Sequence, residues 1–113
     1  MPASFDASRR LKRFSMSERA RCAVPFCRRT ASMAEGFRDG EFLCGPHWRL
    51  RSPATKAAWR EHARIARRNP GPWWEYPPGS AARLVRLASE RGEKALWEAT
   101  RAEVIEVAMG VTA

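Results

Sequence analysis

The sequence predicts a small α+β fold, in which a compact module built from a turn, a β-hairpin and a short helix is followed by α-helices. Three observations lead to this prediction. All three cysteines and one of the two histidines lie at short spacings between residues 22 and 47. The pair Asp39–Gly40, the strongest short hairpin signal in the chain, falls between these groups. From residue 52 onward, apolar side chains recur at helical spacing.

The charge of the chain is unevenly distributed. The 113 residues carry a formal net charge of +9; residues 1–70 hold 16 basic and 6 acidic side chains, and residues 71–113 hold 5 and 6. Most of the basic residues are arginines, which bind phosphates in a bidentate manner. The basic part therefore indicates a surface that faces a polyanion, and the neutral part indicates another role.

The sequence shows neither a membrane-spanning segment nor a secretion signal. A run of about 18 apolar residues is absent, and the N-terminus lacks the uninterrupted apolar stretch of a secretory signal. We therefore expect a cytoplasmic protein, whose thiols stay reduced.

The first elements predicted are short. Residues 1–19 form a basic N-terminal arm, and a capping pattern predicts a short helix over residues 15–21. Two strands, Met33–Arg38 and Glu41–Leu43, are expected on either side of the Asp39–Gly40 turn. A short helix over residues 46–51 follows, opened by a proline at its first position.

The later elements are helical. Ser52–Pro53 supplies the cap and first position of a helix that runs to about Arg68, before prolines and a glycine end it. Two more helices are expected beyond residue 80, separated where Gly92 ends or bends the chain. The chain thus divides into a basic arm (1–19), a Cys3His module with a basic helix (20–70), a Pro/Trp-rich connector (71–79) and a C-terminal helical segment (80–113).

Four residues match the ligand set of a metal site: Cys22, Cys27, Cys44 and His47. Zinc prefers four such ligands in a tetrahedron, and short spacings let one turn present two of them. The first pair lies on a turn that contains Pro25, and the second lies at a predicted helix start, where the dipole stabilises a thiolate. This predicts one structural Zn²⁺ per chain, in a closed site that serves as a scaffold. The alternative is three buried free thiols and a surface imidazole.

A turn, a hairpin and a helix with two ligands at its start is the arrangement of a treble-clef zinc finger. CAVPFCRRT followed by EFLCGPHWRL resembles small Cys3His proteins encoded in bacteriophage and prophage regions, over roughly residues 20–70. The resemblance implies a structural zinc on the same four residues and a bacterial host cell. It implies little about activity, because such modules occur in nucleases, nucleic-acid binders and protein-binding proteins.

The helix expected from Pro53 to Arg68 has a basic face. Lys56, Arg60, Arg64 and Arg67 fall within an arc of roughly 80° at about 100° per residue. Glu61 is the only acid in the helix, so we expect these cations to remain without helical ion pairs. With the basic arm, the candidate phosphate contacts are Arg28, Arg29, Arg49, Arg51, Lys56, Arg60, Arg64 and Arg67. A plain solvated face is the alternative.

The remaining chemistry-bearing residues favour packing. His62 is expected to be a packed histidine with one hydrogen-bond partner, and Trp73, Trp74 and Tyr76 to pack elements together rather than stack on bases. A nuclease of the His-Asn-His type is disfavoured, because with His47 on zinc only His62 remains as a base.

These features predict a non-catalytic, zinc-stabilised nucleic-acid-binding protein of the phage or prophage type, with DNA as the expected partner. The alternative is a zinc-stapled protein–protein interaction adaptor or inhibitor, with partner binding or self-association through residues 80–109. A degenerate or metal-dependent nuclease is a third and weaker interpretation.

Overall fold

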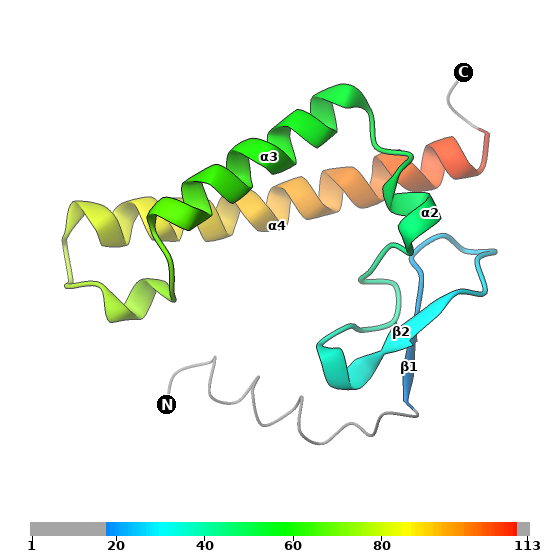
Figure 1. The fold of residues 1–113 in the computed structure, drawn as a ribbon, viewed down its shortest axis with the longest axis horizontal. Helices are drawn as coiled ribbons and strands as arrows, with labels where there is room; N and C mark the ends of the chain where they lie inside the picture. Colours follow the sequence, from blue (N-terminus) through cyan, green and yellow to red (C-terminus); the bar gives the residue numbers. More distant parts are fainter. Residues whose placement is uncertain (1–17, 111–113) are drawn as a thin grey trace. The chain divides into compact units, whose positions relative to one another are not determined.

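The computed structural model describes residues 18–110 and has an α+β fold with one two-stranded sheet (Figure 1). Most of the predicted basic arm (1–19) and the first part of the helix predicted over residues 15–21 lie outside the described residues. The elements are β1 (Arg19–Arg21), β2 (Thr30–Ser32), the 3₁₀-helix η1 (Met33–Glu35), α2 (Gly45–Trp48), α3 (Pro53–Arg68), the 3₁₀-helix η2 (Trp73–Glu75) and α4 (Ala81–Ala108).

The chain forms two compact units, with the division after Leu50. One unit comprises residues 18–50 and 104–110, and it contains the sheet and α2. The other, Arg51–Glu103, contains α3 and most of α4. α3 therefore groups with the connector and α4, although the sequence suggested one module over residues 20–70.

The β-hairpin is real but lies earlier in the chain than predicted. β1 and β2 are antiparallel, with Ala20 opposite Ala31, and their connection carries the first two cysteines. The predicted strands Met33–Arg38 and Glu41–Leu43 are wrong: the first begins as η1, and neither is a strand. The predicted helix over residues 15–21 is also wrong where it is described, since β1 occupies its last three positions.

The Asp39–Gly40 turn nevertheless exists, and its contacts explain the misplaced strands. Glu41 N–H donates to the carbonyl of Arg38 at 2.9 Å, and Gly40 has a φ of 72°, which glycine adopts without strain. The segments on either side of the turn do not pair with each other as strands, and the turn binds β1. Arg21 N–H donates to the Asp39 carboxylate at 2.8 Å, and Gly40 N–H donates to the Arg21 carbonyl at 3.1 Å.

The first unit has a very small apolar core. Apart from the cysteines, its buried apolar side chains are Ala20, Val24, Phe42, Leu43 and Val104. The burial of so few apolar groups offsets only a small part of the conformational entropy that is lost when some 40 residues become ordered. Within residues 18–50 and 104–110, apolar burial alone therefore contributes little stability.

α3 begins and ends where the sequence predicts. The Ser52 hydroxyl accepts the Thr55 N–H at 3.2 Å as the N-cap, and Pro53 stands at the first position. Asn69 caps the other end, with its N–H directed to the Ile65 carbonyl at 3.2 Å. Both boundaries are encoded within four residues of the helix, which is why local sequence predicts them.

α4 is one helix of 28 residues, so the prediction of two helices separated at Gly92 is wrong. Gly92 is not among the glycines with positive φ, and it continues the helix. A glycine inside a helix costs up to about 1 kcal/mol relative to alanine, which packing over a long helix easily offsets.

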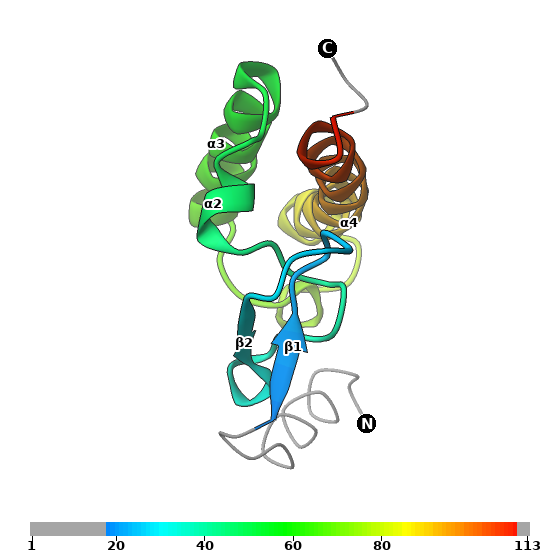
Figure 2. The same cartoon turned by 90° about the vertical axis from the view of Figure 1, so that its right-hand side faces the viewer.

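Within the second unit, α3 and α4 pack antiparallel (Figures 1 and 2). The Thr55 hydroxyl donates to the Glu103 carboxylate at 2.7 Å, and the Trp59 indole N–H donates to the Thr100 hydroxyl at 2.9 Å. One further turn along, His62 lies 3.7 Å from the Glu93 carboxylate. The partners on α4 move backward as α3 advances, as antiparallel packing requires.

The connector after α3 is held by its own aromatic and arginine contacts, as expected of a packing element. The Arg83 guanidinium lies 4.8 Å from the Trp73 ring centroid and donates to the Tyr76 carbonyl at 3.2 Å. Trp73 and Trp74 meet edge to face at 5.7 Å, and the Tyr76 hydroxyl donates to the Pro70 carbonyl at 2.6 Å. No helix among residues 18–110 is long and apolar enough to cross a membrane.

Candidate metal centre

The four predicted ligands converge in the first unit. The ligand atoms of Cys22, Cys27, Cys44 and His47 all lie within 4.8 Å of one another. Cys27 Sγ is 3.8 Å from Cys44 Sγ, and His47 Nδ1 is 3.5 Å from Cys22 Sγ and 3.1 Å from Cys44 Sγ. A zinc tetrahedron with bonds of about 2.3 Å to sulfur and about 2.1 Å to nitrogen has edges of roughly 3.8 and 3.6 Å. Two of the three distances match these edges, and the third, from His47 Nδ1 to Cys44 Sγ, is shorter by about 0.5 Å.

The first ligand pair is presented by the loop that joins β1 to β2. Cys22 N–H donates to the Arg29 carbonyl at 3.1 Å, which closes the base of this loop. At its apex, Cys27 N–H donates to the Val24 carbonyl at 3.0 Å, so Pro25 lies in a tight turn. The four residues between the cysteines thus fold into one turn, and both sulfurs face the same side.

The second pair is presented by the start of α2, as predicted. Cys44 is the N-cap residue, Trp48 N–H donates to its carbonyl at 2.8 Å, and His47 lies three residues on. A backbone hydrogen bond joins the two halves of the site, from Ala23 N–H to the Phe42 carbonyl at 2.8 Å. This bond and those between Arg21 and the Asp39–Gly40 turn bring the two pairs together.

Backbone donors surround the sulfurs. Arg29 N–H points to Cys27 Sγ at 3.4 Å, and Cys44 N–H points to Cys22 Sγ at 3.4 Å. Burial acts to raise the pKa of Cys27, but the Arg29 N–H, the neighbouring thiols and the Arg29 charge together lower it below its ordinary value. Burial raises the pKa of Cys44 despite a hydrogen bond from the His47 backbone. Such N–H groups stabilise metal-bound thiolates and fix their orientation.

The chemistry of these donors fits a metal ion and not a disulfide. All three cysteines are free and buried, and 3.8 Å between Cys27 and Cys44 is far beyond a disulfide bond length of about 2.05 Å. Three soft sulfurs and one imidazole nitrogen are the donor set of structural zinc sites, so the cluster is compatible with one zinc. Four protein ligands leave no position for a substrate water.

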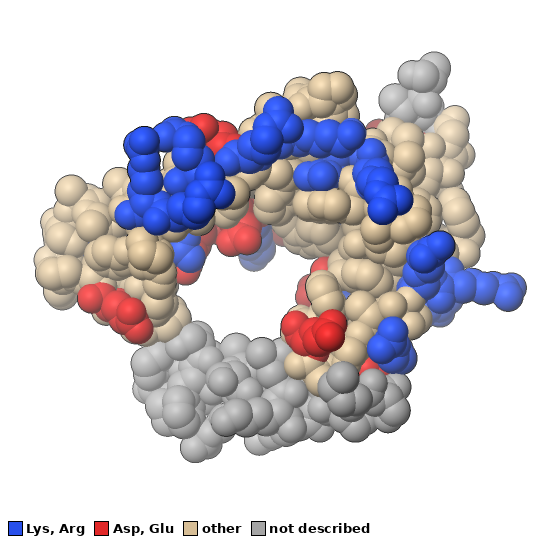
Figure 3. All heavy atoms as spheres, viewed as in Figure 1, with Lys and Arg blue, Asp and Glu red and all other residues tan. Residues whose placement is uncertain are grey.

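The predicted basic face of α3 is present in the second unit, and Figure 3 shows Lys and Arg side chains gathered along this helix. Arg60, Arg64 and Arg67 are exposed, whereas Lys56 is half-buried. The adjacent Arg68, which the sequence analysis left out, is also exposed and extends the face. Counted at about 100° per residue, Arg68 lies only about 40° beyond Arg64 around the helix axis, and this position was the signal that could have found it.

One of the predicted phosphate contacts is already neutralised. The Arg64 guanidinium forms a bidentate pair with the Glu61 carboxylate, so the expectation that this helix makes no internal ion pairs is wrong. The hydrogen bond from Arg64 holds the pKa of Glu61 below its ordinary value. A glutamate three residues before an arginine lies on the same face of a helix, which accounts for the pair.

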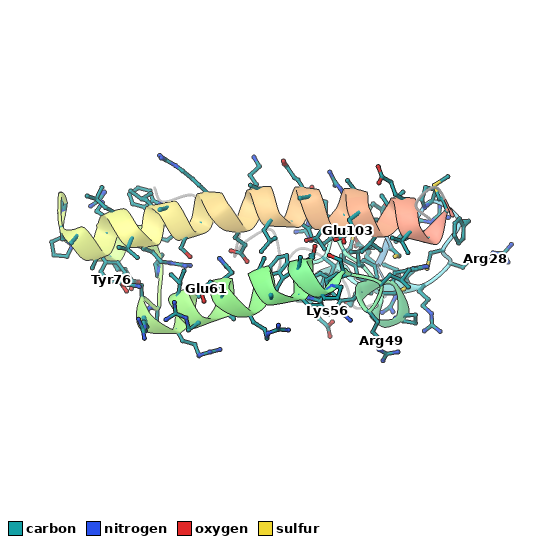
Figure 4. All side chains as sticks on the ribbon, turned by 90° about the horizontal axis from the view of Figure 1, so that it is seen from above. Arg28, Arg49, Lys56, Glu61, Tyr76 and Glu103 are labelled. Carbon is teal, nitrogen blue, oxygen red and sulfur yellow. The ribbon has the colours of Figure 1, made fainter. Side chains whose placement is uncertain are left out.

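The other predicted cations fall into two groups. Arg28, Arg29 and Arg49 are exposed in the first unit, and Figure 4 shows Arg28 and Arg49 directed away from the ribbon. Arg51, in the second unit, is half-buried beside Glu103. Burial and the charge of Arg60 lower the pKa of Arg51, and Glu103 opposes that shift. Arg51 therefore interacts electrostatically with two residues of its own unit, Arg60 and Glu103.

His62 is packed between the helices of the second unit. Its side chain is 15% exposed, lies 3.7 Å from Glu93, and meets the Trp59 ring edge to face at 6.0 Å. Within the described residues, the only cluster of histidine, cysteine and acidic groups suited to a metal is the Cys3His group, and it does not include His62.

Comparison of the chain with protein-family models, with curated proteins and with solved structures gave no match. The functional interpretation therefore depends on the geometry and charge described above.

Proposed function

We propose that the chain is a non-catalytic nucleic-acid-binding protein, of the phage or prophage type, whose treble-clef-like module is held by one structural zinc. DNA is the expected partner, and the bacterial cytoplasm, where thiols remain available to metals, is the expected location. The observation that carries the proposal is the cationic face of α3, defined here as Lys56, Arg60, Arg67 and Arg68.

The cationic face lies opposite the packed face of its own helix. Thr55, Trp59 and His62 contact α4. At about 100° per residue, Arg60 and Arg67 are about 80° or more from each of them around the helix axis. Packing therefore fixes the rotation of α3 and directs these guanidinium groups outward.

The charges on this face repel each other. Arg64 is neutralised by Glu61, but no ion pair involves Lys56, Arg60, Arg67 or Arg68 within residues 18–110. Lys56 and Arg67 are separated by about 16 Å along the helix axis, the rise of roughly five nucleotides of a B-form strand. A row of phosphates would relieve the repulsion and release counterions.

The proposed test is equilibrium binding of the zinc-loaded protein to labelled single-stranded and duplex DNA and RNA, at two salt concentrations. We expect affinity to fall steeply with salt. The double reversal Lys56→Glu/Arg60→Glu should weaken binding about 10-fold or more and reduce the salt slope by about two charges.

The matched control is Arg91→Glu/Lys94→Glu, a reversal of two exposed cations on α4 that changes the net charge by the same amount. It should alter affinity by no more than about threefold, because only long-range attraction changes. Equal effects of the two reversals, or no binding at low salt, would contradict the proposal.

A second candidate, a protein-binding adaptor or inhibitor that uses α4, is favoured by a different observation. Leu84 and Val85 are 61% and 44% exposed on this helix. Val85 also lines an apolar cleft of about 410 Å³ between α3 and α4. If nucleic acid does not bind, polar substitutions at these two positions are the next variants to compare in partner pull-downs.

A further inference from the structure

Phe26 is an exposed aromatic residue at the apex of the metal-binding loop. Its side chain is 61% exposed, an unusual state for a phenyl ring, and Pro25 beside it is exposed as well. The Cys27 N–H to Val24 carbonyl bond of 3.0 Å makes Pro25 and Phe26 the two central residues of a tight turn. The ring therefore projects from the tip of the loop.

The backbone that carries Phe26 is fixed on both sides. Val24 is fully buried, Cys27 is a ligand of the candidate metal site, and the proline ring restricts the turn. The Phe26 ring lies at 83° to the His47 imidazole, with 6.3 Å between centroids. A ring held in this way loses little conformational entropy when it binds a partner, which favours affinity.

The loop that carries this ring is cationic, whereas Glu35, Asp39 and Glu41 lie elsewhere in the same unit. Residues 19–34 contain four arginines and no acidic side chain. Arg28 and Arg29 follow Phe26 directly and are exposed, and Arg49 is exposed on α2 in the same unit. Three thiolates on a divalent ion would leave one net negative charge at the metal. The exposed arginines carry more positive charge than this one negative charge would cancel.

We propose that Phe26 stacks on an unpaired base of single-stranded nucleic acid while Arg28 and Arg29 bind the adjacent phosphates. The proposal rests on the proposed nucleic-acid binding and names the substrate form that the first unit selects. A flat aromatic ring among arginines is the combination that binds single strands, because each unpaired base offers a π-face and each nucleotide a phosphate. In a duplex those faces are already stacked, so Phe26 discriminates between the two forms.

The test compares Phe26→Ala, Phe26→Leu and Phe26→Trp in the zinc-loaded full chain, with labelled single-stranded and duplex DNA and RNA of equal length. Phe26→Ala and Phe26→Leu should weaken single-strand binding by about 5- to 150-fold, the loss that removal of one base stack produces. Phe26→Trp should keep or increase single-strand affinity, since tryptophan stacks at least as well. Duplex affinity should change by less than about twofold in all three.

Phe26→Leu is the decisive variant, because leucine keeps the apolar surface and removes the π-face. Leu84→Ala is the matched control, since Leu84 has the same exposed fraction of 61% in the other unit, and it should leave binding unchanged. Wild-type affinity in Phe26→Leu, or an equal loss on single strands and duplexes, overturns the stacking proposal. If the wild-type protein binds no nucleic acid, the proposed function fails with it. If the Lys56→Glu/Arg60→Glu reversal weakens binding but the Phe26 variants do not, stacking alone fails.

Discussion

At the scale of single residues, Glu103 shows how one carboxylate fixes the start of α3. Its two oxygens accept the Ser52 N–H at 3.0 Å and the Thr55 hydroxyl at 2.7 Å. The Thr55 hydroxyl is the main cause that lowers the pKa of Glu103, and Ser52 and the charge of Arg51 add to it against the opposing effect of burial. The charged form is therefore the one that the folded state prefers.

This preference predicts that Glu103→Gln lowers the free energy of unfolding by an amount that depends on pH. Because the folded-state pKa lies below the unfolded value of about 4.3, the carboxylate stabilises the fold at neutral pH. That contribution is lost as the pH falls through the folded-state pKa. We expect the variant to lower the free energy of unfolding by roughly 1–2 kcal/mol at pH 7 and by much less near pH 3.

Urea unfolding of both proteins at matched zinc concentrations, so that loss of metal in acid affects them equally, measures this difference. A cost of Glu103→Gln that is independent of pH would contradict the assignment of the stabilising contact to the ionised carboxylate.

Individual residues were predictable where their chemistry depends on spacing alone. The ligands Cys22, Cys27, Cys44 and His47 were identified from two short spacings, and the structure brings all four together. Arg64 was misjudged because the number of acids in the helix was considered and the three-residue spacing between Glu61 and Arg64 was not.

At the scale of elements, the continuity of α4 gives a test based on two glycines. Gly92 lies inside the helix at an exposed position, and an added Cβ would meet nothing within 4 Å. Gly110, beyond the C-terminal end of α4, has a φ of 73°, which non-glycine residues rarely adopt.

Gly92→Ala should therefore raise the free energy of unfolding by about 0.4–1 kcal/mol, and Gly110→Ala should lower it by about 1 kcal/mol. Thermal or urea unfolding followed by circular dichroism measures both changes. Destabilisation by Gly92→Ala would indicate that the helix breaks at this glycine, as the sequence alone suggested.

Secondary-structure elements were predictable where residues within a few positions of their ends determine where they begin and stop. The cap and the proline at the start of α3, and the residues that stop it after Arg68, lie within a few residues of its ends. The strands were not predictable in this way, because β1 pairs with Thr30–Ser32 and also binds the Asp39–Gly40 turn. Both contacts are long-range hydrogen bonds, which a hairpin signal such as Asp39–Gly40 does not encode.

At the scale of the whole molecule, the two units differ in what holds them together. The second unit has an antiparallel helix pair, with hydrogen bonds at Thr55 and Trp59 along its length. The first has a two-stranded sheet, a one-turn helix and few buried apolar side chains. Metal binding supplies about 10 kcal/mol or more in small structural zinc sites, enough to decide whether such a unit folds.

The central claim is that the Cys3His group binds one zinc on which the first unit and its arginines depend. The measurement that tests it most directly is the zinc content of the full chain, purified without chelator and analysed by native mass spectrometry, beside Cys44→Ser. We expect one zinc per wild-type chain, from the four converging ligands, and a large loss in the variant. A folded wild-type protein with zinc content near zero, or a variant that retains the full amount, would contradict the claim.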